Sequence, residues 1–345
     1  MPLQNKPTLA DVAQYAKVST ATVSRALNAP ETVAQDTRDA IQAAIETLGY
    51  TPHFAGRALA SNRSNTIGVI IPTLANAMFA NGIHAFQEEL SKAGVIMLLA
   101  TSDYDPEQEY EQVKSLITHG ADGLMLIGAN RPQKTRDFLR LRGVPYVLSW
   151  CFGDDPNQTY AGFDNAAAAA AMTRKILSLG HRKIALIGGI SKGNDRARGR
   201  IEGVKSAIAA FGMNAKLVAE TESPYLLDDA QAAFDRVHSA APDATAIIGG
   251  SDVLAAGAIL RANALGLRVP EDLSITGFDD IGLAAVSSPP LTTVHVPQVE
   301  MGRAAACLLL QFVQDRNAPQ SIEIETQISM RGSLTPPPQQ GKEHE

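Results

Sequence analysis

Apolar positions near the start of the chain recur at helical spacing. A first helix is predicted to begin behind Thr8 and Asp11, which are spaced as a capping box, and its apolar positions are Leu9, Val12, Ala13 and Ala16. Residues 17–19 interrupt this pattern. Ser19 is a good N-cap, so a second helix is predicted over residues 20–27.

This second helix is too short to be stable alone in water and must pack against neighbouring helices. The pattern predicts a third helix over residues 34–48, which Gly49 ends. Packing of the second helix through its apolar residues leaves an open face, made of Thr20, Ala21, Thr22, Ser24 and Arg25. Two helices joined by a three-residue turn form a helix-turn-helix.

From residue 66 onward, apolar runs typical of strands alternate with helical segments. The expected strands are 67–71, 96–100, 123–127, 146–148, 184–187, 217–219, 246–248 and 274–277. The expected helices include 80–93, 107–119, 164–179, 196–211, 228–240 and 252–265. Repeated βα units imply parallel sheets with helices on both faces. Two such halves would form a two-lobed domain, with chain crossovers near 160–164, near 290–293 and before a strand at 321–326.

Composition adds few constraints. The chain of 345 residues is 45% hydrophobic and 19% charged, which is typical of a globular protein with more than one domain. Cys151 and Cys307 form no disulfide framework or metal-site pattern, and both are expected in the core. The sequence shows no signal peptide and no membrane span, so we expect a cytoplasmic protein without membrane, metal or cofactor.

The formal net charge of −6 argues against a nucleic-acid partner only as an average. Residues 1–30 carry a net charge of +2, residues 31–50 carry −3, and residues 51–63 carry +2. Positive charge therefore flanks the second helix, whereas the third helix and the rest of the chain would repel DNA. We expect modest phosphate attraction and a shallow salt dependence of any DNA binding.

The residues of the helix-turn-helix carry a family resemblance. The runs 8–13 and 16–28, followed by 48–52, 58–59 and the strand 67–72, resemble the lactose/galactose-repressor family of bacterial regulators. Lys17 replaces the Gly common in the family's turn, which implies strain if its φ is positive.

The resemblance implies an N-terminal all-α helix-turn-helix domain and an α/β, two-lobed effector domain like a periplasmic binding protein. The expected boundaries are 1–50 for the DNA-binding domain, 51–63 for a hinge, 64–333 for effector binding and dimerisation, and 334–345 for a disordered tail.

A helix-turn-helix presents its second helix to base edges in the major groove. Arg25 is expected to pair with guanine, unless it forms a surface ion pair instead. Ala21 and Thr20 suit a thymine methyl group. Ser19, Thr22 and Ser24 suit phosphates, although Thr22 and Ser24 could instead be plain capping or surface residues. The other candidates at this interface are Thr8 and Asn28.

The resemblance implies that the hinge folds on DNA and lies in the minor groove. Leu59 matches the family's leucine wedge, and Arg57 is a further DNA-binding candidate. Gly56 stands where the family prefers Ala, so we expect a hinge whose order depends strongly on DNA. The alternative is that Leu59 packs against the body.

Ligands of open parallel sheets bind beyond the carboxyl ends of the strands. The candidates there are Asn76, Phe79, Asp103, Trp150, Arg196, Arg200, Ser251 and Asp279. Asn76 and Phe79 match the family's Asn-x-x-Phe loop, and residues 200–203 match its Arg-x-x-Gly motif. Carboxylate, guanidinium and aromatic side chains suit a sugar or sugar acid.

Four candidate positions near these strand ends have plainer interpretations. Asp279 could cap a turn, and Arg196 could be an exposed surface charge. Asp252 could be the N-cap of the next helix, and Trp150 could be a core residue.

These patterns and the family resemblance together imply a homodimeric transcriptional regulator, most simply a repressor, that binds a near-palindromic, double-stranded operator under control of a small-molecule effector. The alternatives are a solute-binding protein of a transporter and a sugar-processing enzyme with the same two-lobed fold. No catalytic constellation accompanies the turn at residues 188–193, so we do not expect an enzyme.

Overall fold

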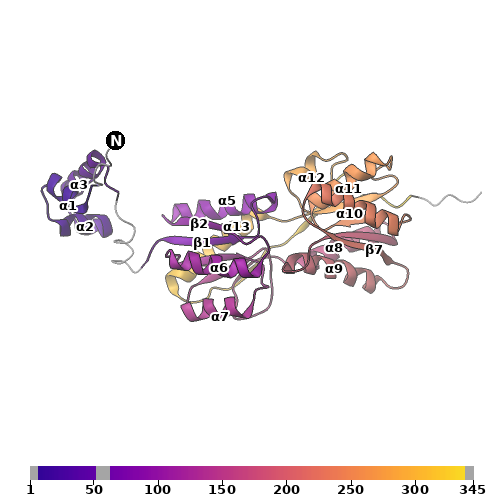
Figure 1. Ribbon diagram of the computed structural model, residues 1–345, viewed down its shortest axis with the longest axis horizontal. Helices are drawn as coiled ribbons and strands as arrows, with labels where there is room; N and C mark the ends of the chain where they lie inside the picture. Colours follow the sequence, from indigo (N-terminus) through magenta and orange to yellow (C-terminus); the bar gives the residue numbers. More distant parts are fainter. Residues whose placement is uncertain (1–6, 52–62, 339–345) are drawn as a thin grey trace, which may run out of the picture. The chain divides into compact units, whose positions relative to one another are not determined.

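The computed structural model describes residues 7–51 and 63–338. The chain divides into two compact units, Met1–Asn65 and Thr66–Glu345. Figure 1 shows the first unit as a small group of helices and the second as two α/β lobes. None of the helices within the described ranges is long and apolar enough to cross a membrane.

The N-terminal unit contains the three expected helices. They are α1 (Leu9–Tyr15), α2 (Thr20–Asn28) and α3 (Gln35–Leu48), with a 3-10 turn, η1 (Pro30–Thr32), between the last two. The fully buried side chains Val12, Val23 and Ala44, one from each helix, form the centre of its core. Gly49 ends α3 in the left-handed conformation, as expected.

Lobe 1 is built on a six-stranded sheet in the order β11-β5-β4-β3-β1-β2. Its strands are β1 (Thr66–Ile71), β2 (Ile96–Thr101), β3 (Gly123–Ile127), β4 (Tyr146–Ser149), β5 (Tyr160–Gly162) and β11 (Ile322–Glu323). Its helices are η2 (Ala77–Phe79), α5 (Ala80–Lys92), α6 (Pro106–Thr118), α7 (Gln133–Arg142) and α13 (Gln298–Asp315). All its strand pairs are parallel.

Lobe 2 is built on a second six-stranded sheet in the order β12-β10-β9-β8-β6-β7. Its strands are β6 (Lys183–Gly189), β7 (Lys216–Ser223), β8 (Ala246–Gly249), β9 (Ser274–Asp279), β10 (Thr292–His295) and β12 (Gln327–Ser329). Its helices are α8 (Asn165–Ser178), α9 (Asp195–Phe211), α10 (Leu227–Ala240), α11 (Asp252–Ala264) and α12 (Gly282–Val286). Only β12 is antiparallel to its neighbour.

Helices cover both faces of each sheet, as the apolar strands predict (Figure 1). In β1, Val69 packs on the face covered by α5 and α13, whereas Ile70 packs on the face covered by α6 and α7. In β6, Leu186 and Ile187 alternate in the same way between the faces of α8–α9 and α10–α11. This alternation follows from the period of two residues in a strand.

Three chain crossovers join the lobes. The first follows β5, as expected. The second follows β10 and lies at residues 296–297 rather than near 290–293. The third lies between β11 and β12, at residues 324–326, so the expected strand at 321–326 is two short strands in different sheets.

Two further expectations about the chain differ from the structure. Cys151 is buried, but Cys307 is exposed on α13, so only the first is a core residue. Residues 334–338 belong to the ordered chain rather than to a tail. Leu334 is buried, and the backbone carbonyl of Thr335 lies 2.7 Å from Nε2 of His181.

Candidate functional site

The capping box at the start of α1 is confirmed. The Thr8 side chain accepts from the backbone N–H of Asp11, and the Asp11 carboxylate accepts from the Thr8 backbone N–H at 2.7 Å. Hydrogen bonds from the Thr8 side chain and backbone hold the pKa of Asp11 below its usual value. Lys17 adopts φ 56° in the turn that follows, which is the strained conformation anticipated for a residue in place of Gly.

Ser19 caps α2, as expected. Its Oγ accepts from the backbone N–H of Thr22 at 3.0 Å and lies 2.8 Å from the Thr22 hydroxyl. These contacts support a role of Thr22 in the cap of α2, whereas a contact between Thr22 and a phosphate stays a prediction.

The open face of α2 is formed by exposed Thr20, Ala21 and Arg25, with Ser24 half-buried beside them. Arg25 forms no ion pair with any residue that the structure describes, and its contact with guanine stays a prediction. Asn28 is the last residue of α2. Arg57 and Leu59 lie outside the described residues.

In lobe 1, Asn76 and Trp150 follow the carboxyl ends of β1 and β4. Asn76 caps η2 by accepting from the Met78 backbone N–H at 3.2 Å. Its Nδ2 is buried without a partner among the described residues, and so is the indole Nε1 of Trp150. Two buried donors without acceptors are unusual in a folded protein and make this place a candidate binding site.

Trp150 and Phe79 pack edge to face, with ring centroids 5.4 Å apart, and both are fully buried. In this arrangement of the lobes, Trp150 is therefore a core residue, as its plainer interpretation predicted. A Cβ on Gly82 would lie within 3.0 Å of the Trp150 ring and of the Gln298 backbone carbonyl, so only glycine allows this packing. Gln298 is a further residue of this site, which the sequence analysis did not identify. Its Oε1 is also buried without a partner among the described residues.

In lobe 2, Arg200 of α9 is the centre of a buried network. Its guanidinium donates to Asp279 at 2.9 Å, to the Asn165 side chain at 2.9 Å and to the Gly250 carbonyl at 2.7 Å. It also lies 3.7 Å above the Phe278 ring centroid. Burial raises the pKa of the Asp279 carboxyl, and the Arg200 charge opposes that rise.

The Arg200 network reaches both lobes through Asn165, a residue that the sequence analysis did not identify. The Asn165 amide donates to the backbone carbonyl of Trp150 at 2.9 Å. Gly203, one turn after Arg200, lets α9 approach α8 closely, since a Cβ there would lie 2.2 Å from the Ala166 carbonyl oxygen. The Arg-x-x-Gly spacing thus places the guanidinium beside the first turn of α8.

A second contact between the lobes comes from the first turn of α9. The Asp195 carboxylate accepts from the backbone N–H groups of Ala129 and Asn130, at 2.6 and 3.3 Å, and pairs with Arg196 at 2.9 Å. Arg196 is buried, so its interpretation as a surface charge is wrong. Asp195 itself was not anticipated, because nothing in its local sequence shows that the other lobe provides donors.

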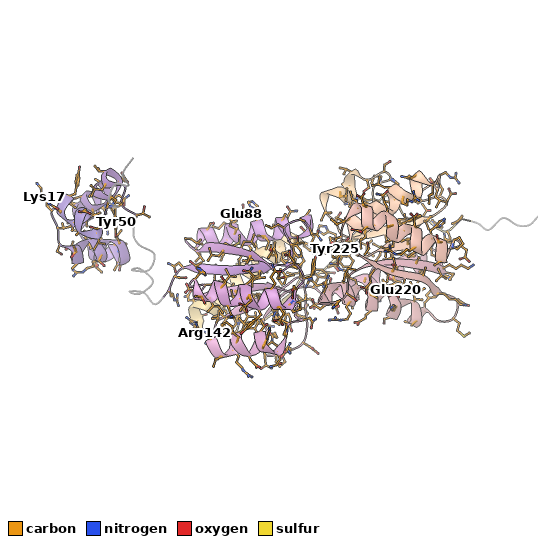
Figure 2. The ribbon with its side chains drawn as sticks, viewed as in Figure 1. Lys17, Tyr50, Glu88, Arg142, Glu220 and Tyr225 are labelled. Atoms are coloured by element: carbon orange, nitrogen blue, oxygen red, sulfur yellow. The ribbon has the colours of Figure 1, made fainter. Side chains whose placement is uncertain are left out.

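Tyr104, rather than Asp103, faces lobe 2. Asp103 is exposed and accepts from Gln108 at 3.3 Å, whereas Tyr104 and Arg196 line a cavity of about 20 Å³ between the lobes. The rings of Tyr104 and Tyr225 lie 6.2 Å apart across the lobes, and Figure 2 labels Tyr225 on the side of lobe 2 that faces lobe 1. Burial raises the pKa of both phenols.

Ser251, rather than Asp252, caps α11, because its side chain accepts from the Leu254 backbone N–H at 3.3 Å. Asp252 is fully buried and accepts from the Ile281 backbone N–H at 2.8 Å and from the Thr293 hydroxyl. Burial, with the neighbouring Asp279 charge, raises the pKa of Asp252 to about 8. Within the described ranges, no cluster of His, Cys, Asp and Glu is arranged to hold a metal ion.

Strained backbone marks the strand ends that form this site. Asp103, Tyr104, Trp150 and Asp279 all have positive φ, between 50° and 105°. Such conformations cost about 1–3 kcal/mol each and are concentrated at binding sites. The site is therefore an interlobe cleft, lined by polar and aromatic side chains and closed in this structure.

Comparison with known proteins agrees with this geometry. Residues 8–53 match the family of bacterial regulatory proteins, lacI family, and residues 173–334 match the periplasmic binding protein-like domain. The repressor CytR of Escherichia coli K12 is 32% identical over 327 residues, covering 94% of this chain and 96% of CytR. The regulator MalR of Streptomyces coelicolor is 34% identical over 340 residues, covering 96% and 97%.

Solved structures give the same result over the whole chain. The lac repressor dimer bound to operator and the anti-inducer ONPF superimposes with a TM-score of 0.86, at 25% identity, and covers 96% of this chain and 100% of its own. The CelR–cellobiose complex gives a TM-score of 0.69 at 29% identity, covering 95% and 100%. The chain belongs to the lacI family of bacterial regulatory proteins and is a DNA-binding transcriptional regulator controlled by a small molecule.

Proposed function

We propose that this regulator is a cytoplasmic homodimeric repressor that binds a near-palindromic operator. Its effector, a sugar or sugar acid, occupies the cleft between the lobes. The cleft carries this proposal, because buried donor atoms of Asn76 and Trp150 have no acceptor among the described residues. Hydroxyl and carboxylate oxygens of such an effector would satisfy both donors.

At the DNA end, the exposed face of α2 supports base recognition. Thr20, Ala21 and Arg25 are exposed on it, and the folded turn holds α2 in place. Ser19, Thr22, Ser24, Asn28 and Thr8 would contact phosphates or fix the register. The roles of Arg57 and Leu59 in a minor-groove hinge rest on the sequence resemblance.

At the effector end, Asp279 and Arg200 would bind hydroxyl groups from lobe 2. Trp150 and Phe79 would provide an aromatic surface from lobe 1. Both rings are buried in this closed arrangement, so effector entry requires the lobes to separate. The CelR–cellobiose complex supports a carbohydrate effector, since CelR has the same architecture.

Effector binding is coupled to DNA binding if the effector shifts the equilibrium between open and closed arrangements of the lobes. β1 leads directly from the hinge, so a change in lobe 1 changes the spacing of the two hinges in a dimer. We place the dimer contact on residues 77–93 and 252–265. Exposed Leu260 on α11 and exposed Ile96 on the edge strand beside α5 support these two surfaces.

The test uses the single tryptophan of the chain. Trp150 fluorescence is titrated with sugars, sugar acids and nucleosides, and operator affinity is measured with the same compounds. We expect one class of compound to change both. Asn76→Ser retains a capping oxygen and removes the Nδ2 donor, so it should weaken the fluorescence response and leave operator binding without effector unchanged. An effector that alters operator binding with no change in Trp150 fluorescence would contradict this site.

A further inference from the structure

We propose that lobe 1 carries a second DNA-contact surface, which binds phosphates flanking the operator. This surface, the basic edge, consists of Arg136, Arg140, Arg142 and Arg316. The proposal rests on DNA binding by the N-terminal unit and adds a contact from the effector unit.

Three residues of the basic edge line a groove of about 630 Å³. Arg136 and Arg140 line it from α7, and Arg316 lines it from the end of α13. Asn157 and Gln158 also line it, from the loop between β4 and β5, and the Asn157 side-chain amide donates to Asp155. Guanidinium groups around one groove are the groups that proteins use most often to bind phosphate oxygens.

Three of the four arginines of this edge form no ion pair with the described residues. Arg136 donates to the Arg131 backbone carbonyl and to the neutral Gln133 side chain, and Arg142 lies over the Phe138 ring. Arg316 ends α13 in a left-handed conformation. Among the described residues, no carboxylate forms an ion pair with Arg136, Arg142 or Arg316.

Four aspartates lie near the basic edge. Asp137 pairs with Arg140 at 2.8 Å, although the Arg140 side chain remains 81% exposed. Asp155 is bonded within its own loop by the Asn157 backbone and side chain. Asp154 precedes it in the same loop, and Asp315 precedes Arg316. Three arginines and one aspartate line the groove itself, so its lining is positive on a body whose overall charge is negative.

The strand register places the basic edge where the chain enters lobe 1. Ile67 pairs with Gly123, and Leu124 pairs with Tyr146, so β1, β3 and β4 begin at one edge of the sheet. Arg142 ends α7 just before β4 at that edge. Figure 2 labels it at the end of lobe 1 farthest from lobe 2.

The same edge is therefore the covalent attachment point of the DNA-binding unit, because β1 begins at Thr66. Residues 52–62 form the connection between the described parts of the two units. At roughly 3.3–3.6 Å per residue, this segment spans at most about 40 Å. A tether of this length would let the groove approach phosphates beside the operator, and electrostatic attraction to them favours the groove over the rest of the acidic body.

The experiment compares wild type with the double variant Arg140→Ala/Arg316→Ala. The probe is an operator selected by the wild-type protein from random duplexes, prepared once as the bare operator and once with about ten flanking base pairs on each side. Arg303→Ala is the matched control, because Arg303 is an exposed arginine of α13 outside the groove. Thermal unfolding confirms that all variants fold.

We expect the wild type to bind the longer duplex about tenfold more tightly and with a steeper salt dependence. The double variant should lose that advantage, with the slope of log K against log salt reduced by about 0.9 for each lost phosphate contact. It should bind the bare operator normally. Arg303→Ala should behave as wild type on both duplexes.

Equal wild-type affinity for the two duplexes would overturn the basic edge and leave the proposed function intact. A length advantage that persists in the double variant would also overturn it. Failure of the wild type to select any operator would overturn the proposed function and the basic edge with it.

Discussion

Arg25 and Ala21 lie one turn apart on α2, so they share the face that the helix presents to solvent. A planar guanidinium donates two parallel hydrogen bonds to guanine, which a thymine-contacting methyl group cannot do. Base discrimination by α2 should therefore depend mainly on this one side chain.

Arg25→Ala is expected to weaken operator binding by about 1–3 kcal/mol and to relax one base preference. Fluorescence anisotropy with the operator and its single-base variants measures both effects. Arg38→Ala, on α3, is the control for loss of one positive charge. An unchanged binding isotherm for Arg25→Ala would remove this residue from the interface.

Asp252 provides a second prediction, because its surroundings alter its titration. An aspartate in an unfolded chain titrates near about 3.9, whereas burial raises the pKa of folded Asp252 to about 8. Between these two values the folded state binds more protons than the unfolded state. Its contribution to stability is therefore present at low pH and is lost as pH rises through this window.

Asp252→Asn removes this titration. We expect the variant to gain stability relative to wild type by on the order of 1 kcal/mol per pH unit between about pH 4 and pH 8. Urea unfolding at several pH values gives the comparison, and Asp228→Asn on α10 controls for loss of a carboxylate. Parallel pH profiles for wild type and Asp252→Asn would contradict the expected origin of the pH dependence.

At the scale of secondary-structure elements, the contacts that matter most lie at the ends of helices. The turn between α1 and α2 holds Lys17 at φ 56°, where an L side chain is strained and glycine is not. The positive charge of Lys17 nevertheless favours DNA. Stability and affinity therefore have opposite preferences at this position.

Lys17→Gly should stabilise the N-terminal unit by about 1 kcal/mol by removing the left-handed strain. It should also weaken operator binding slightly at low salt. Thermal unfolding and salt-dependent binding measure the two effects separately. A destabilised N-terminal unit would show that the Lys17 side chain contributes more through its contacts than its backbone costs.

The start of α9 joins the lobes through Asp195. Two backbone N–H groups of lobe 1 donate to this carboxylate, and hydrogen bonds to a charged group contribute about 1.5–3 kcal/mol. Gly128 lies beside it with φ 78°, where a Cβ would collide with the side chains of Asp195 and Arg196. The first turn of α9 therefore helps to keep the lobes closed.

Asp195→Ala should shift the ligand-free protein toward an open arrangement. Small-angle X-ray scattering would show this as a larger radius of gyration, and the effector response of Trp150 should weaken about tenfold. Glu202→Ala, an exposed carboxylate on the same helix, is the control. An unchanged radius of gyration would mean that the Arg200 network alone holds the lobes together.

At the scale of the molecule, charge is distributed unevenly. The overall charge is −6, but residues 1–30 and 51–63 each carry +2. The operator is therefore approached by a small basic region attached to an acidic body. Affinity must then depend on neutral contacts and dimerisation as well as on phosphate attraction.

We expect operator binding to show a salt slope well below the magnitude of about 10 known for a strongly basic repressor. Measurement of affinity between 50 and 200 mM salt tests this expectation, and a duplex without the operator provides the nonspecific baseline. A slope as steep as 10 would indicate phosphate contacts from many more cations than this region holds.

Much of the fold could be predicted because its causes are local. Capping side chains, apolar periodicity and the position of Gly49 determine α1, α2 and α3. The first nine strands, apart from β5, follow from apolar runs, since strands buried on both faces need them. Short β10, β11 and β12 carry weaker patterns, and their sheet membership depends on distant partners.

The residues of the candidate site also fall into two groups, those that local sequence indicated and those that it did not. Position after a strand indicated Trp150 and Asp279, because strand ends meet at one edge of a sheet, and the family's motifs indicated Asn76 and Arg200. Tyr104, Asn165, Asp195 and Gln298 were missed, since each makes its contact with the other lobe. Burial of Arg196 and exposure of Cys307 were also decided by packing rather than by residue type.

The sequence by itself determined the helix-turn-helix, the βα alternation and the family, because these depend on spacing over a few residues or on a matched motif. Only the tertiary structure decided which lobe each crossover strand joins, which polar groups are paired and which remain without partners. It also brought Arg316 beside α7. Such contacts join residues far apart in the chain, and their energies depend on burial and on charges that no local pattern contains.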